Sequence, residues 1–225
     1  MSIWIIFIGF TLLSWLVSHQ LKSRFQKYSQ IPTSNGMSGK EVVEQMLKDH
    51  GITGVRIGSV SGQLSDHYNP AEKTINLSQE VYHGRNVAAA AVAAHETGHA
   101  IQHAQAYSWL QMRSALVPVV SFSSKWVQWI LLAGIIMINS FPQLLLAGIV
   151  MFAATTLFSF ITLPVEIDAS NRALKWLKTT GITTYESQKS ADDALRWAAY
   201  TYIVAALSSL ATLMYYVMLY MGRRE

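Results

Sequence analysis

The stretch Ala94-His95-Glu96-Thr97-Gly98-His99-Ala100 decides how this chain must fold. It lies in an alanine-rich run without proline, from Val87 to Ala106, which predicts a single helix. Residues four apart on a helix return to nearly the same face one turn further on, so His95 and His99 can direct their imidazoles at one ion. Two imidazoles are half of a metal site. The rest of the chain must therefore bring a further ligand to this helix.

Glu96 directly follows the first histidine, where its carboxylate could take a proton from a metal-bound water and pass it to a leaving amine. Zinc suits this donor set because imidazole and carboxylate bind it well and because zinc lowers the pKa of bound water. The pattern His-Glu-x-x-His on a helix is typical of zinc metallopeptidases. Two helical histidines can also be plain surface residues, but this segment is expected to be buried, where imidazoles need partners.

The composition indicates a membrane protein rather than a soluble domain. Of the 225 residues, 51% are hydrophobic and only 13% are charged. The charged residues cluster in two blocks, and each uncharged segment is near or above the roughly 20 residues that a helix needs to cross a bilayer. The net charge of +4 comes without a basic patch interleaved with aromatic residues, so we expect no nucleic-acid partner. The absence of cysteine excludes disulfides, thiolate zinc sites and cysteine nucleophiles.

Four transmembrane helices are predicted, and the lipid bilayer is an expected partner. The first covers residues 1–21 and is followed by basic residues, which favours a retained anchor over a cleaved signal peptide. Residues 115–164 are predicted to form a hairpin of two spans, because the uncharged stretch from Trp126 to Val165 is interrupted only around Asn139–Gln143. The fourth span covers residues 198–222, with tyrosines near its far end as interfacial anchors.

The first water-facing part, residues 22–114, is predicted to hold a short helix, a small sheet and the helix of the two histidines. Ser38 and Glu41 have the spacing of a capping box ahead of an amphipathic helix that ends at Gly51. Residues 52–78 predict short strands joined by a turn near Asn69-Pro70.

The strand Thr74–Ser78 carries a further hypothesis. If it lies at the edge of the sheet, its free backbone groups could pair with an extended substrate segment. A purely structural strand is the alternative.

The second water-facing part, residues 165–197, is where we look for the third ligand, because a hairpin returns the chain to the side of the histidine helix. Pro164 is predicted to begin a new helix there, with Glu166 and Asp168 in its first turns. On spacing alone Glu166 is the best-placed ligand and Asp168 the runner-up. An acidic pair that only favours a helix start is the alternative.

His103 stands one turn beyond His99 but is not expected to share the ion. Three successive turns spread the ligands over about 12 Å, whereas a Zn–N bond is only about 2 Å long. The metzincin pattern is also excluded, because it needs glycine at 102 and histidine at 105, where this chain has glutamine. Residues that could support the ligands or contact substrate are His103, Asp168, Arg172 and His67, and candidates for an oxyanion donor are His103, Tyr107 and Arg172.

Three stretches together resemble the YugP-like bacterial membrane zinc metallopeptidases, namely Ala93–Gln102, Asp66–Pro70 and Pro164–Ala173. The resemblance covers almost the whole chain. More distantly, Glu166 and Ala169 match the Glu-x-x-Ala element of the HtpX-like gluzincin proteases, whose glutamate binds zinc. The resemblance implies that His95, His99 and Glu166 are the metal ligands and Glu96 the general base. Ser170 departs from the HtpX-like pattern, which has an aspartate after the alanine.

We therefore expect a predominantly α membrane protein with four transmembrane helices and a small α+β, gluzincin-type zinc protease domain. The expected function is that of an integral membrane zinc metalloendopeptidase acting on membrane or membrane-proximal proteins. The alternative is a catalytically silent metal-binding scaffold that regulates a partner protein. A transporter is disfavoured because the spans hold no charges well inside, and a di-iron oxidase is disfavoured because only one histidine box is present.

The basic residues near the span ends predict the orientation of a multi-pass protein in the plasma membrane of a bacterium. Because positive loops stay inside, the metal site is expected to face the cytoplasm. The expected catalytic side carries eight such residues and the other side two: Lys22, Arg24, Lys27, Arg113, Arg172, Lys175, Lys178 and Arg196 against Arg223 and Arg224.

Overall fold

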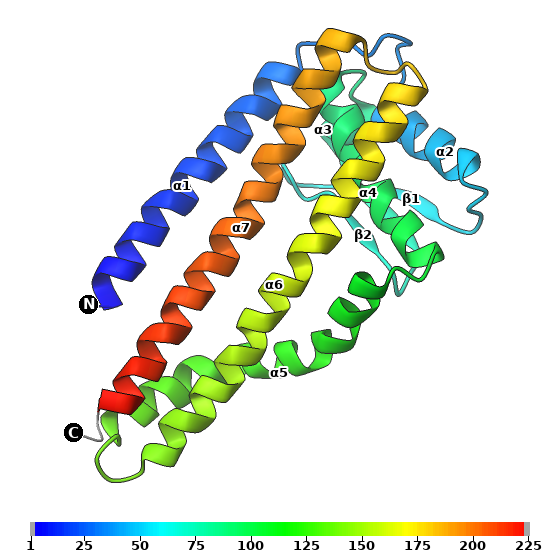
Figure 1. Ribbon diagram of the computed structural model, residues 1–225. Coiled ribbons are helices and arrows are strands. Elements are labelled where there is room, and N and C mark those ends of the chain that lie inside the picture. Colours follow the sequence, from blue (N-terminus) through cyan, green and yellow to red (C-terminus); the bar gives the residue numbers. More distant parts are fainter. Residues whose placement is uncertain (1–2, 223–225) are drawn as a thin grey trace. The chain divides into compact units, whose positions relative to one another are not determined.

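The computed structural model describes residues 3–222, which are predominantly helical and include one small sheet (Figure 1). Four of the helices are long and apolar enough to cross a membrane: α1 (Ile3–Tyr28), α5 (Ser108–Ile136), α6 (Pro142–Thr179) and α7 (Tyr185–Gly222). The prediction of a mainly helical chain with four such helices and a small sheet is therefore confirmed. Residues 1 and 2 of the first predicted span, and Arg223 and Arg224, lie outside the described residues.

The chain divides into two compact units. Within the described residues the apolar unit holds 3–16, 111–163 and 201–222, and the site unit holds 17–110 and 164–200. Large apolar side chains lie exposed on the apolar unit, among them Trp4 at 67%, Val150 at 63% and Ile136 at 75%. A surface of this kind needs a cover such as lipid. The predicted division of the chain into membrane spans and water-facing catalytic parts stays a prediction.

Within the apolar unit, α5 and α6 form a closely packed hairpin. They are joined by the short loop 137–141, where the break in the uncharged stretch predicted a turn. A Cβ atom on Gly134 would lie 2.6 Å from Leu145 Cα, and one on Gly148 would lie 2.8 Å from a side-chain carbon of Leu131. Glycine at these positions is what allows the two helices to approach so closely.

In the site unit, α2 (Gly39–Asp49) begins as its sequence predicted. The Ser38 hydroxyl accepts a hydrogen bond from the Glu41 backbone N–H, while the Glu41 carboxylate accepts one from the Ser38 backbone N–H at 2.7 Å. This capping box satisfies N–H groups that have no partner within the helix. Beyond the helix, Gly51 adopts a positive φ of 64°, which a residue without a Cβ tolerates. Between these two ends, the helix buries Val42, Val43 and Met46 in the core.

The sheet has three strands, β1 (Arg56–Val60), β2 (His67–Asn69) and β3 (Thr74–Ser78), in the order β1-β3-β2. β3 pairs in parallel with β1 and antiparallel with β2. The hypothesis that Thr74–Ser78 is an edge strand is therefore wrong: it is the central strand. Its apolar residues Ile75 and Leu77 are fully buried, which explains why this strand took the middle position.

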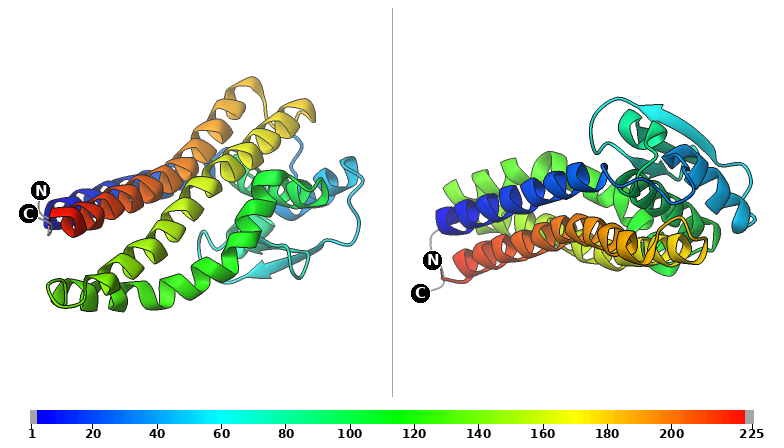
Figure 2. Two further views of the ribbon diagram at one scale, coloured as in Figure 1. Left: turned by 60° about the horizontal axis from the view of Figure 1, so that its bottom comes forward. Right: turned by 90° about the horizontal axis from the view of Figure 1, so that it is seen from above.

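Helix α4 (Val87–Ala104) carries both histidines and is buried on nearly all sides. The Asn86 side chain caps it by accepting a hydrogen bond from the Ala89 N–H at 2.9 Å. Small alanines suit a helix that contacts α2, the sheet and the short helix α3 (Gln79–His83) together. Figure 2 shows the cyan strands beside the green helix α4.

Helix α6 passes through Pro164 without interruption, so the prediction that a new helix begins there is wrong. A proline inside a helix removes one backbone hydrogen bond and clashes with the preceding turn. After the proline, Val165, Ala169 and Ala173 are all fully buried, and this packing offsets the local cost. Glu166 is consequently part of the same continuous helix as the second arm of the hairpin.

Candidate metal centre

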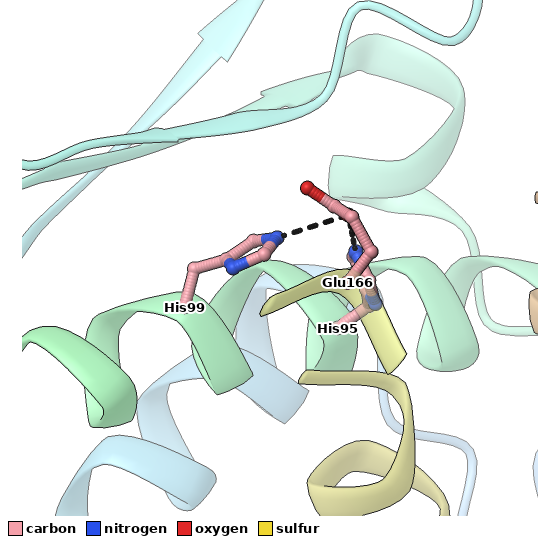
Figure 3. A group of neighbouring side chains, drawn as sticks. All are labelled: His95, His99 and Glu166. Carbon is pink, nitrogen blue, oxygen red and sulfur yellow. Dashed lines mark hydrogen bonds and ion pairs between the residues drawn. The ribbon is translucent and has the colours of Figure 1, made fainter. Parts of the chain in front are cut away.

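Three side chains from two helices converge in the site unit. His95 and His99 come from successive turns of α4, and Glu166 comes from α6 (Figure 3). One carboxylate oxygen, Oε2 of Glu166, lies 3.3 Å from His95 Nε2 and 3.5 Å from His99 Nε2. The two rings stand nearly perpendicular, with centroids 4.8 Å apart. Among the described residues, these three form the group of His and acidic side chains that could hold a metal ion.

The spacing of the donor atoms fits zinc. For Zn–N and Zn–O bonds of about 2.0–2.1 Å, two ligands at the corners of a tetrahedron lie about 3.3 Å apart. The two imidazole-to-carboxylate distances of 3.3 and 3.5 Å match that edge length, and all three donor atoms lie within 4.8 Å of one another. Three protein ligands leave a fourth position for water or substrate, as in catalytic zinc sites.

Each imidazole is held at its other nitrogen, Nδ1. The Nδ1 atom of His95 lies 3.1 Å from the Ser170 hydroxyl, and that of His99 lies 3.0 Å from the Gln102 side-chain oxygen. When Nδ1 carries the proton and donates it, the lone pair of Nε2 is free for a metal. Ser170 thus contacts the first histidine where the HtpX-like pattern has an aspartate, so a neutral hydroxyl takes the place of a carboxylate.

Gly98 allows the two helices that carry the ligands to touch. A Cβ atom on Gly98 would lie only 2.7 Å from the Ala169 carbonyl oxygen and 3.1 Å from Ala169 Cα. Glycine inside a helix costs roughly 1 kcal/mol relative to alanine, so its presence in α4 signals a packing requirement. The close contact brings Glu166, one turn before Ala169 on α6, within reach of the histidines.

Glu96 is buried beside the first histidine, with 8% of its surface exposed. Its negative charge reaches two neighbours. It helps to raise the pKa of His99. The pKa of Asp66 is raised mainly by burial and also by the charge of Glu96, while the hydrogen bond from the Ser78 backbone N–H lowers it. Asp66 also accepts a bond from the Ser78 hydroxyl. A second carboxyl group therefore lies within electrostatic range of Glu96.

The pKa of His99 is set by burial on one side and by its polar partners on α6 and α4 on the other. Burial alone disfavours the charged imidazolium, but the hydrogen bond and charge of Glu166 outweigh it and raise the pKa of His99 above its ordinary value. A proton on His99 Nε2 would occupy the lone pair that a metal ion needs. Acid should therefore oppose metal binding here.

The other candidate residues lie outside the group of three. The His103 Nδ1 atom is 2.7 Å from the hydroxyl of Tyr68 on β2, and burial raises the pKa of that phenol. His67 is exposed on β2, with Nδ1 2.8 Å from the Ser65 carbonyl. Asp168 accepts a hydrogen bond from Arg172 at 2.5 Å. Asp168 is thereby engaged elsewhere, and the roles proposed for these four residues stay predictions.

Arg172 is held on three sides. Besides Asp168, it donates to the Gln105 side chain at 2.6 Å, and its guanidinium lies 5.8 Å from the centre of the Tyr107 ring. A guanidinium so engaged is poorly placed to serve as an oxyanion donor unless it leaves these partners.

Sequence reasoning gave no role to Gly98 or Gln102. The signal for Gly98 was present, because a glycine in an otherwise alanine-rich helix is costly without a close neighbour. The signal for Gln102 was its seven-residue spacing from His95, which places a polar side chain on the ligand-bearing face of a buried helix. Both residues act through α6, and nothing in the sequence of α4 alone says which helix will pack there.

Comparison with known proteins gives a consistent result. A family model described as "Putative neutral zinc metallopeptidase" matches residues 3–221. Among the curated proteins, "Putative membrane protease YugP" of Bacillus subtilis (strain 168) is 38% identical over 213 residues, which cover 95% of this chain and 94% of that protein. No solved structure matches the chain.

Proposed function

The chain belongs to the zinc metallopeptidase family whose model spans almost its entire length, and on that premise we propose that it is an integral membrane metalloendopeptidase of gluzincin type. His95, His99 and Glu166 would hold the zinc ion, and Glu96 would act as general base. The observation that carries the proposal is the meeting of two α4 imidazoles and one α6 carboxylate, whose donor atoms lie within 4.8 Å of one another, with both imidazole-to-carboxylate distances near the edge of a zinc tetrahedron.

The chemistry follows from the side chains around this group. When bound, zinc supplies a water of lowered pKa and polarises the peptide carbonyl. The Glu96 carboxylate accepts the proton that this water gives up and delivers it to the departing amide nitrogen. Glu96 is buried and directly follows the ligand His95 on α4. The Gln102 oxygen can only accept a hydrogen bond, so it favours the His99 tautomer that leaves Nε2 free, while the Ser170 hydroxyl, which can donate or accept, orients the His95 ring.

Substrates are proposed to be membrane proteins or chains presented at the bilayer surface. Glu166 lies three residues after Leu163, the last residue of the apolar unit in α6. A ligand on the same helix as a membrane span fixes the reaction to the neighbourhood of the bilayer.

The catalytic part is proposed to face the cytoplasm of a bacterium, on the strength of the basic residues near the span ends. The cysteine-free sequence makes the orientation directly measurable. Single cysteines in place of exposed Glu72 and exposed Asn139 would be treated, in intact cells, with a maleimide that cannot cross membranes. We expect labelling at 139 without permeabilisation and at 72 only after it. The reverse pattern would place the metal site outside.

The catalytic role is tested with Glu96→Gln in purified full-length protein in lipid nanodiscs. We expect zinc content equal to that of wild type and a fall of roughly 100- to 10,000-fold in the rate of hydrolysis of casein or a membrane-protein substrate. Glu80→Gln is the matched control, because Glu80 is an exposed glutamate that accepts a bond from Gln63. A silent metal-binding scaffold would instead show no zinc-dependent hydrolysis in the wild type, and Glu96→Gln would change nothing.

A further inference from the structure

Gln102 is the one fully buried amide beside the metal centre within the described residues, and every polar atom of its side chain is used. Its oxygen lies 3.0 Å from His99 Nδ1 on its own helix, α4. Its nitrogen donates to the Val165 carbonyl oxygen at 2.8 Å and to the Asp168 carboxylate at 2.8 Å, both on α6. The side chain therefore contacts one ligand directly and the backbone next to another.

The residue type is dictated by this geometry. The position needs one acceptor that faces α4 and two donors that face α6, and only a primary amide offers both. A carboxylate lacks the donors, and lysine or arginine lacks the acceptor. Asparagine has the same groups but is one methylene shorter, so it cannot span the same gap.

We propose that Gln102 is a positioning residue that locks the two ligand-bearing helices together around the metal. Through its oxygen it fixes His99 as the Nδ1-protonated tautomer, and through its nitrogen it holds α6 at Val165, the residue before Glu166. Asp168 belongs to the same arrangement, because it accepts from Gln102 and from Arg172. One amide thus sets the position of two of the three donors. This inference rests on the proposed metal site.

The test compares Gln102→Met with Gln105→Met in the full-length protein. Methionine is close to glutamine in shape but has none of its hydrogen-bonding groups. Gln105 is a matched control because it lies three residues further along the same chain and contacts Arg172 of the same network, yet makes no bond to His99. The probes are zinc alone, titrated against a chromophoric chelator, and cobalt(II), whose visible absorption reports the coordination geometry.

We expect Gln102→Met to weaken zinc binding by about 10- to 100-fold, the range found for outer hydrogen-bond partners of metal ligands. Its cobalt spectrum should lose intensity in the tetrahedral region, whereas Gln105→Met should stay within about twofold of wild type in affinity with an unchanged spectrum. Equal zinc affinity and an equal spectrum in Gln102→Met would overturn the inference. So would a lower melting temperature of the metal-free protein without any change in metal binding, because that result indicates packing alone.

A second variant keeps the inference testable if Gln102→Met does not fold. Gln102→Glu preserves the shape and the acceptor that faces His99 but removes both donors to α6, so zinc binding should weaken several-fold. Unchanged affinity would show that α6 does not depend on this clamp. A wild-type protein that binds no zinc would contradict the proposed function itself, whereas a zinc-binding wild type with indifferent variants would contradict only the role of Gln102.

Discussion

Helix α6 meets α5 in the apolar unit and α4 in the site unit, and in both places a glycine brings two backbones together. At the hairpin, Gly134 faces Leu145 and the surroundings are apolar. At the metal centre, Gly98 faces Ala169, and the same contact is lined by Glu166, Gln102 and Ser170, which all have partners. The comparison teaches that a close approach of two helices needs only apolar packing around it when the contact is structural. A reactive site needs polar groups that are fully satisfied around that approach.

The largest expected effect tests whether the polar contact is a metal site. Glu166→Ala removes one of three donors, so zinc affinity should fall by more than the roughly 10- to 100-fold typical of an outer contact. The apolar hairpin should be unaffected. Asp168→Ala is the control, because the spacing of the sequence left both acids as candidates, and it should cost less. Chelator competition measures both variants, and a greater loss with Asp168→Ala would exchange their roles.

The next effect compares the two glycines directly. Gly98→Ala places a methyl group 2.7 Å from the Ala169 carbonyl oxygen, and Gly134→Ala places one 2.6 Å from Leu145 Cα. Overpacking of this kind typically costs about 1–3 kcal/mol, so both variants should unfold at lower temperature. Only Gly98→Ala should also weaken zinc binding, because it displaces the helix that carries Glu166. Equal zinc loss in both variants would mean that the two contacts are not independent.

A smaller effect compares one polar contact from each unit. Ser170→Ala removes the partner of His95 Nδ1 and should weaken zinc binding about 10-fold. Thr156→Val removes a hydroxyl that lies 2.7 Å from the Ser209 hydroxyl on α7. Interhelical bonds of this type contribute about 0.6 kcal/mol, so the variant should lose a little thermal stability and no zinc affinity. Titration with zinc and thermal unfolding, run side by side, separate the two outcomes.

The smallest effect concerns the cap of α2, which is part of neither glycine contact. Hydrogen bonds from Ser38, aided by Arg85, lower the pKa of Glu41 from 4.5 to about 2. A carboxyl whose pKa is depressed by folding stabilises the protein above pH 4.5, and this contribution is lost as the pH falls from 4.5 to 2. Glu41→Gln should therefore melt a few degrees below wild type at pH 6. The difference should shrink below pH 4.5; a constant difference would exclude the charge as its cause.

The parts of the fold that could be predicted are those that depend on residues close together in the sequence. The four spans follow from uncharged length, the cap of α2 follows from Ser38 and Glu41, and the histidine helix follows from its alanines. The place of β3 could not be predicted, because strand order depends on pairing partners and not on the strand itself. The buried character of Ile75 and Leu77 was visible, but a five-residue strand reads the same at an edge or in the centre.

The candidate site divides in the same way. The histidine pair is a local pattern. Spacing ranked Glu166 above Asp168 and a resemblance strengthened that ranking, but only the packing of α6 decides which acid faces α4. The prediction at Pro164 was wrong because a proline usually marks the start or end of a helix. Here α6 continues through Pro164, and the buried residues that follow it stabilise the continuous helix. Gln102 and Ser170 became meaningful only when the second helix was in place.

The hydrogen atom that serves as the side chain of Gly98 has a consequence for anyone who wishes to transplant this centre. Patterns written as His-Glu-x-x-His treat the two middle positions as free, yet here one of them is reserved by the backbone of another helix. A designer could copy the histidines and the glutamate onto a new scaffold and place alanine at the position of Gly98 to favour the helix. The helix would be more stable, but the second helix could not approach closely enough to supply the third metal ligand.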